Sequence, residues 1–154
     1  MDTLHFERKI VLDPYSDKNM VCAITTINNQ SLLEIVRKYE FPYPPKDDPN
    51  NIADAYEYQF AYELHNELSD KKYRINDDEV TLLICRGCFE EGCWPFIVKL
   101  KELDDCIIWK DFHNPHRLVD SISGFWDFSN FGTFCFDKTA YRKEVEKLKS
   151  FSHE

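Results

Sequence analysis

Of the 154 residues in the chain, 43% are hydrophobic and 31% are charged, which is the composition of a folded globular protein and excludes a disordered one. The 28 acidic and 19 basic side chains give a net charge of -9, which repels phosphate backbones and anionic lipids, so neither nucleic acid nor a membrane is an expected partner. No membrane-spanning apolar run and no signal peptide pattern is present, so we predict one cytoplasmic globular domain over residues 1–154.

The first part of the chain has the pattern of a β-hairpin followed by a short helix. Residues 4–12 and 20–27 are rich in strand-forming residues, and the turn-forming sequence DPYSDKN separates them. Ser31 and Glu34 stand at the spacing of a helix-capping pair, and apolar residues then recur at helical spacing. We therefore predict two antiparallel strands and a helix that begins at Ser31.

A proline-rich connector over residues 40–51 leads to a second predicted helix. Apolar residues recur at every fourth position, which is the spacing of a buried helical face; they are Ile52, Tyr56, Phe60, Leu64 and Leu68. We therefore predict a helix that begins at Ile52. Two further tyrosines, Tyr58 and Tyr62, widen its apolar face, and they are either core residues or part of a partner surface.

Three strands are predicted next, over residues 80–85, 94–101 and 106–112. In the second of them apolar residues alternate with others, as in a strand with one buried face. Short turns would join the three strands into an antiparallel meander. The predicted fold class is therefore α+β, a single domain with an antiparallel meander sheet and helices covering one face.

The C-terminal part is predicted to hold a short strand around residues 133–136 and a terminal helix. Asp137 is suited to the N-cap of this helix, and Phe136 and Tyr141 have the spacing of a hydrophobic staple. Tyr141, Val145 and Leu148 recur at helical spacing. We expect these three side chains to form the buried face of the helix.

Three cysteines are crowded into the turn between the first two strands of the meander. A pair of cysteines two residues apart is a common half of a structural zinc site, and the meander would bring two histidines close to them. The candidate zinc ligands are Cys85, Cys88, Cys93, His113 and His116. In the alternative interpretation the thiols are small residues packed at a crowded turn, and the protein has no cofactor.

The sequence DFHNPHR contains acidic, basic and anion-binding side chains within one short segment. Such residues can carry out acid-base catalysis or bind a carboxylate or phosphate group, and a pair formed by Cys93 and His113 could supply a nucleophile. The alternative is a turn in which Asp111 accepts backbone N–H groups and Arg117 pairs with a nearby acid.

The following sequence, GFWDFSNFGTFCF, is rich in aromatic residues and has no basic residue, so base stacking is not expected. Its aromatic side chains either anchor a protein partner or cap the core. Together with the preceding segment it supplies the candidate binding residues, which are Asp111, His116, Arg117, Trp126 and Asp127.

Three segments in the second half of the chain, GCFEEGCWPFIVKL, IIWKDFHNPHR and WDFSNFGTFCFDKTAY, resemble motifs of a widespread family of small uncharacterised bacterial proteins. The resemblance implies no activity, substrate or cofactor. It implies a shared framework, to which Cys85 does not belong. The framework residues are Cys88, Cys93, Trp94, Asp111, Phe112, His116, Arg117, Trp126, Asp127, Asp137 and Tyr141.

The acidity, the many aromatic residues and the lack of a complete catalytic pattern lead to a prediction about function. We predict a noncatalytic protein-interaction domain, immunity-like or antitoxin-like, with a basic or neutral protein as its partner. The alternative is a zinc-binding domain or a small enzyme that uses the Cys/His cluster at one end of the sheet.

Overall fold

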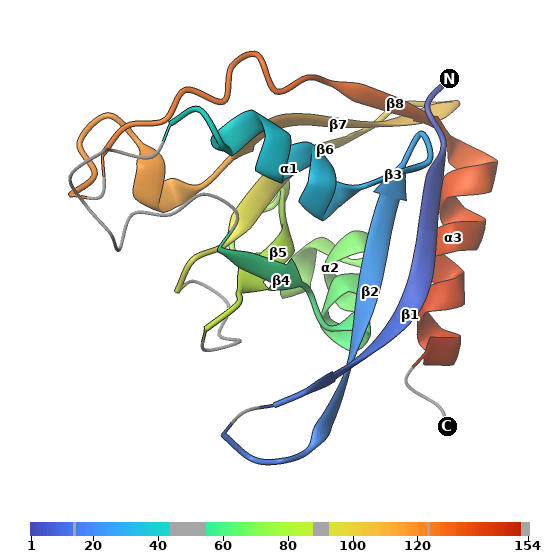
Figure 1. Ribbon diagram of the computed structural model, residues 1–154. Coiled ribbons are helices and arrows are strands. Elements are labelled where there is room, and N and C mark those ends of the chain that lie inside the picture. The colour runs from blue at the N-terminus through green and yellow to red at the C-terminus, as the bar shows by residue number, and fades with distance from the viewer. Residues whose placement is uncertain (14, 44–54, 88–92, 123, 152–154) are drawn as a thin grey trace.

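The computed structural model describes residues 1–13, 15–43, 55–87, 93–122 and 124–151 (Figure 1). The N-terminal sheet consists of β1 (Leu4–Leu12), β2 (Asn19–Ile27) and β3 (Gln30–Ser31), paired in that order and antiparallel. Strands β1 and β2 form the predicted hairpin. It extends well beyond the rest of the described structure at its turn end (Figure 1).

The second sheet is an antiparallel meander whose strands pair in chain order. Its strands are β4 (Tyr56–Tyr58), β5 (Glu79–Cys85), β6 (Phe96–Glu102), β7 (Cys106–His113) and β8 (Phe134–Asp137). The predicted α+β fold class with an antiparallel meander is confirmed. Short connections join β5 to β6 and β6 to β7, whereas residues 59–78 separate β4 from β5 and residues 114–133 separate β7 from β8.

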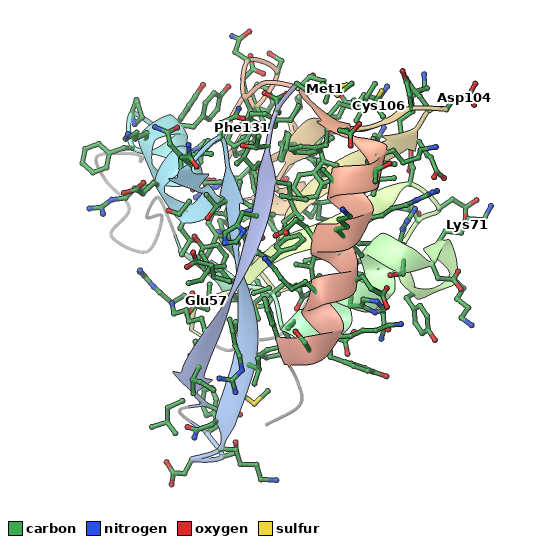
Figure 2. All side chains as sticks on the ribbon, turned by 90° about the vertical axis from the view of Figure 1, so that its right-hand side faces the viewer. Met1, Glu57, Lys71, Asp104, Cys106 and Phe131 are labelled. Carbon is green, nitrogen blue, oxygen red and sulfur yellow. The ribbon has the colours of Figure 1, made fainter. Side chains whose placement is uncertain are left out.

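In the described part of the chain, three α-helices pack against the two sheets. They are α1 (Leu32–Glu40), α2 (Ala61–Ser69) and α3 (Lys138–Phe151), and two short 3-10 helices, η1 (Lys71–Tyr73) and η2 (Pro115–Arg117), lie in the connections. Helix α3 packs against α2 and β1 (Figure 2). None of the helices in the described part of the chain is both long and apolar enough to cross a membrane.

The helix caps follow the sequence. The Ser31 side chain accepts a hydrogen bond from the Glu34 backbone N–H, and that of Asp137 accepts one from the Ala140 N–H at 2.9 Å. The predicted staple is present, because the rings of Phe136 and Tyr141 stack with their centroids 5.7 Å apart. These local contacts define where α1 and α3 begin.

The predicted second helix is wrong in its first part. Tyr56 and Tyr58 lie in β4, which pairs with Cys85 to Leu83 of β5, and α2 begins only at Ala61. Ile52, where we expected the helix to start, lies outside the described residues. Residues four apart share a face in a strand as well as in a helix, so the spacing fits both, and pairing with β5 favours the strand.

Two single bridges join the sheets to each other. Cys22 of β2 pairs with Phe60, next to a hydrogen bond from the Ala23 N–H to the Gln59 carbonyl at 3.0 Å. At the other end Asp2 pairs with Phe136 of β8. The hairpin therefore contacts both edges of the meander, and the aromatic and aliphatic core lies between the two sheets.

Candidate functional site

A cavity of about 360 Å³ lies where β5, β6 and β7 meet the segment that follows η2. Of the five predicted binding residues, Asp111 and Trp126 line it, and His116, Arg117 and Asp127 do not. Its apolar side is formed by Leu118, Phe125, Trp126 and Phe128, and its charged side by Glu79, Lys99, Asp111 and His113. Sequence reasoning had placed Asp111, His113 and Trp126 among the candidate residues, and the fold brings all three together.

A β-bulge shapes the charged side of this cavity. Ile97 of β6 pairs with His113 and Lys99 pairs with Lys110, so β7 contains one residue more than β6 between these pairs. Asp111 lies in the bulge with φ at 52°, in the left-handed region that few residues other than glycine adopt. The bulge therefore explains why two successive residues, Lys110 and Asp111, both lie outside the core before the buried Phe112.

His113 bridges the bulge and the neighbouring strand. Its Nδ1 lies 2.8 Å from the Asp111 carbonyl oxygen, an acceptor, so Nδ1 carries a proton and donates. Its Nε2 lies 3.6 Å from a carboxylate oxygen of Glu79. The imidazole thus lies between β5 and β7, with Nε2 facing the carboxylate of Glu79 at the cavity wall.

Arg117 lies at the centre of a stack of flat side chains beside the cavity. Its guanidinium carbon is 3.6 Å from the centre of the Trp126 ring and 4.8 Å from that of Trp94. The His116 ring stacks on Trp94 at 5.4 Å with an interplanar angle of 3°. Arg117 is only 1% exposed, so in this structure its charge is buried between two indole rings and does not face an external anion.

A buried hydrogen-bond network connects this stack to α1. The Tyr56 hydroxyl donates to a Glu40 carboxylate oxygen at 2.7 Å and accepts from the Asn114 side-chain amide at 2.9 Å. Burial, and then the charge of Glu40, raise the pKa of Tyr56 well above its ordinary value, while Arg117 acts in the opposite direction. Tyr56 therefore keeps its proton, and the network fixes η2 to the core.

Hydrogen bonds and ring stacking connect the segment that holds Trp126 and Asp127 to the C-terminal part of α1 and the residues after it. The hydroxyls of Tyr39 and Tyr43 both donate to the Asp127 carbonyl oxygen, at 2.6 and 3.2 Å, and the Tyr43 ring stacks on Trp126. The Asp127 carboxylate accepts hydrogen bonds from Ser129, which lower its pKa, so it stays ionised at neutral pH. Asp127 is exposed, and both Trp126 and Phe128 beside it are buried.

The five candidate zinc ligands are placed differently from one another. Cys85 is half-buried at the end of β5, Cys93 is exposed, and Cys88 lies outside the described residues. The two histidines point to different partners, His113 to Glu79 and His116 to Trp94. Among the residues that the structure describes, no three His, Cys, Asp or Glu side chains form a group that could hold a metal ion. The zinc hypothesis stays a prediction that elemental analysis of the purified protein tests.

The thiols are expected to differ strongly in reactivity. Cys22 is fully buried, and burial together with the nearby Glu57 carboxylate raises its pKa to about 12. At pH 8 a maleimide should therefore modify the exposed Cys93 in the folded protein and leave Cys22 unmodified until the chain is unfolded in urea. Peptide mass mapping after short exposure checks this. Modification of both thiols at the same rate in the folded protein would contradict the buried position of Cys22.

Sequence reasoning missed part of the cavity. Glu79, Lys99, Leu118 and Phe125 were not among the candidate residues. For Leu118 and Phe125 the sequence RLVDSISGF did contain a signal. Its apolar residues are mixed with turn-forming ones and lack the period of a helix or strand, which indicates apolar side chains on a loop. Comparisons with protein-family models, curated proteins and solved structures found no match to this chain.

Proposed function

We propose that this chain is a noncatalytic protein-interaction domain, immunity-like or antitoxin-like, that binds a basic protein at the rim of the cavity beside β7. Its docking surface consists of Leu118, Val119, Ile122 and Phe125. Their exposed fractions are 51%, 75%, 107% and 52%. Four large apolar side chains exposed so close together in sequence are the observation that carries the proposal, because such groups usually mark a binding surface.

Hydrogen bonds connect the docking surface to the buried stack around Arg117. Leu118 donates its N–H to the Ser121 hydroxyl at 2.9 Å, and the Ser121 N–H donates to the Leu118 carbonyl at 2.9 Å. The Trp126 N–H donates to the Arg117 carbonyl at 3.0 Å, which ties the end of this segment to the buried stack. A surface held in this way loses little conformational entropy when a partner binds.

Charge complementarity favours a basic partner. Asp111 at the bulge, Asp120 within the docking segment and Asp127 after it are all exposed carboxylates near the apolar residues. With the net charge of -9 they would steer a basic protein toward this side of the molecule. Leu118 and Phe125 also line the cavity, so an apolar side chain of the partner can insert between them and be surrounded by a charged rim.

The experiment has two stages. Wild-type protein and the Ile122→Asp variant are used as baits in parallel, and quantitative mass spectrometry identifies proteins that only the wild type retains. The partner is then purified, and its binding is measured by calorimetry at low and high salt. We expect direct binding that Ile122→Asp weakens by about tenfold or more, and that weakens further as salt rises.

Tyr62→Asp is the matched control for this experiment, because Tyr62 is also a large hydrophobic residue, 64% exposed on α2, and it lies outside the docking surface. It should bind the partner as tightly as the wild type. The proposal fails if no protein distinguishes the wild type from Ile122→Asp, or if Tyr62→Asp and Ile122→Asp weaken binding equally.

A further inference from the structure

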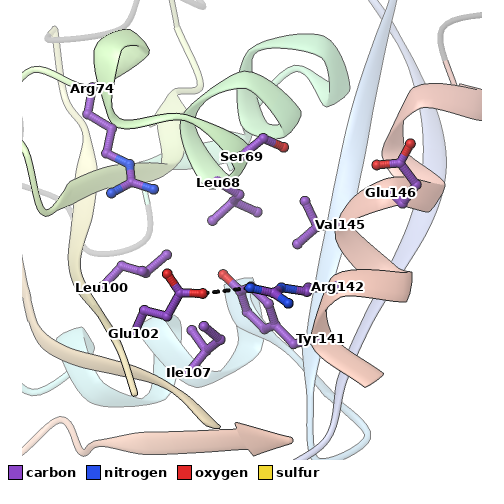
Figure 3. A pocket seen from close by; sticks show the side chains of 10 residues that line it. All are labelled: Leu68, Ser69, Arg74, Leu100, Glu102, Ile107, Tyr141, Arg142, Val145 and Glu146. Atoms are coloured by element: carbon purple, nitrogen blue, oxygen red, sulfur yellow. Dashed lines mark hydrogen bonds and ion pairs between the residues drawn. The ribbon is translucent and has the colours of Figure 1, made fainter. Parts of the chain in front are cut away.

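A second cavity, of about 380 Å³, lies between α2, α3 and the β6–β7 part of the meander (Figure 3). It shares no lining residue with the cavity beside the docking surface. Its apolar lining comes from three parts of the fold: Leu68 from α2, Leu100 and Ile107 from the meander, and Val145 from α3. Two arginines and two glutamates also lie around it, so the cavity combines an apolar floor with charged walls.

Arg74 is oriented into this cavity by the backbone. Its Nε donates to the Glu67 carbonyl oxygen at 2.6 Å, and its Nη1 donates to the Asp77 carbonyl oxygen at 2.8 Å. Figure 3 shows its guanidinium directed toward the space between Leu68 and Leu100. Both acceptors are uncharged, and no carboxylate in the described ranges forms an ion pair with Arg74. Its positive charge is thus fixed in place and has no side-chain counterion there.

The other charged groups around the cavity are compensated within the protein. Glu102 accepts hydrogen bonds from Arg142 at 2.8 Å and is 3.4 Å from the Lys138 ammonium. Although partial burial alone would raise the pKa of Glu102, these two cations lower it, so Glu102 is ionised and engaged. Glu146 pairs with Lys149 at 2.9 Å. Arg74 is therefore the cation at the cavity that pairs with no carboxylate in the described part of the chain.

We propose that this cavity binds a small organic carboxylate with a compact apolar body. The carboxylate would accept hydrogen bonds from the N–H groups of Arg74 that point into the cavity, and the apolar body would lie against Leu68, Leu100 and Val145. The guanidinium of Arg74 would form charge-assisted hydrogen bonds with one carboxylate. The apolar floor favours a ligand with a hydrocarbon part over a simple inorganic anion.

The probe for this proposal is 3-phenylpropionate, in which a short alkyl chain joins one carboxylate to a phenyl ring. It is titrated into protein labelled with ¹³C at Leu, Ile and Val methyl groups, and the methyl signals are followed by NMR. The signals of Leu68, Leu100, Ile107 and Val145 should shift in a saturable way, with a dissociation constant in the millimolar range that suits a ligand of this size. The uncharged 3-phenylpropionamide should bind at least about tenfold more weakly.

Two variants test the role of the charge. Arg74→Gln should weaken binding of 3-phenylpropionate by about tenfold or more, and Arg37→Gln, the same change at an exposed site on α1, should leave it unaltered. Arg74 also donates hydrogen bonds to two backbone carbonyls, so its replacement affects the fold as well as the charge. Ser69→Glu is therefore a second test, which adds a negative charge at an exposed position of the cavity wall. It should weaken binding to a similar degree.

The outcomes separate cleanly. Three results would each overturn the proposal. The acid and the amide bind equally, the wild type and Ser69→Glu bind the acid equally, or inorganic phosphate gives methyl shifts of the same size. If Arg74→Gln does not fold, the Ser69→Glu titration and the amide comparison decide. None of these readouts depends on the docking surface, so failure here leaves the protein-interaction proposal untouched.

Discussion

Replacement of Arg117 by alanine is expected to lower the free energy of unfolding by about 3–5 kcal/mol, because it removes two buried cation–π contacts and leaves a cavity in their place. The guanidinium lies between the rings of Trp94 and Trp126, and desolvated cation–π contacts of this kind each contribute up to about 2 kcal/mol. Truncation also leaves a cavity beside both rings and removes a cation that acts on the buried Tyr56. Urea unfolding followed by circular dichroism measures the loss.

The lysine variant tests whether planarity matters as well as charge. Arg117→Lys keeps the positive charge but cannot stack on two rings, so we expect an intermediate loss of about 2 kcal/mol. Arg37→Ala, at an exposed position on α1, is the control and should change stability by less than about 0.5 kcal/mol. An Arg117→Ala protein as stable as Arg37→Ala would show that the stack does not hold the structure together.

Replacement of Phe96 by alanine is expected to cost a similar amount, about 3–5 kcal/mol, because it empties a large volume in a packed core. Phe96 is fully buried, and its ring contacts those of four other residues. Tyr56 and Phe112 belong to the meander, and Phe128 and Phe131 belong to the segment that carries the cavity wall. Phe96 therefore joins the sheet to the segment that follows the docking surface, and thermal and urea unfolding should both show the loss.

Phe125→Ala is the matched control for Phe96→Ala, because it removes the same ring from an exposed position. Phe125 is 52% exposed, so its removal should change the free energy of unfolding by less than about 0.5 kcal/mol. The same variant should weaken partner binding, since Phe125 belongs to the docking surface. A Phe125→Ala protein that loses stability like Phe96→Ala would mean that the segment is part of the core and not a free surface.

The candidate site shows where sequence reasoning reaches its limit. Asp111, His113 and Trp126 were predicted from residue type alone, and they do share a cavity. Glu79 and Lys99, which line the same cavity, come from β5 and β6, and the bulge at Asp111 depends on how β7 pairs with β6. Arg117 was expected at a binding site or in an ion pair, and the fold instead stacks it between two indoles. Such placements depend on long-range packing, which has no local signature.

What the sequence by itself determined is the set of local structures. The hairpin, the meander and the caps of α1 and α3 follow from strand propensity, turn residues and capping side chains within a few positions of each other. Tertiary structure alone decided that Tyr56 to Tyr58 form a strand, since pairing with β5 supplies the backbone partners that the periodic pattern cannot specify. It also decided which charges are buried and which face a cavity, because burial is a property of the assembled fold.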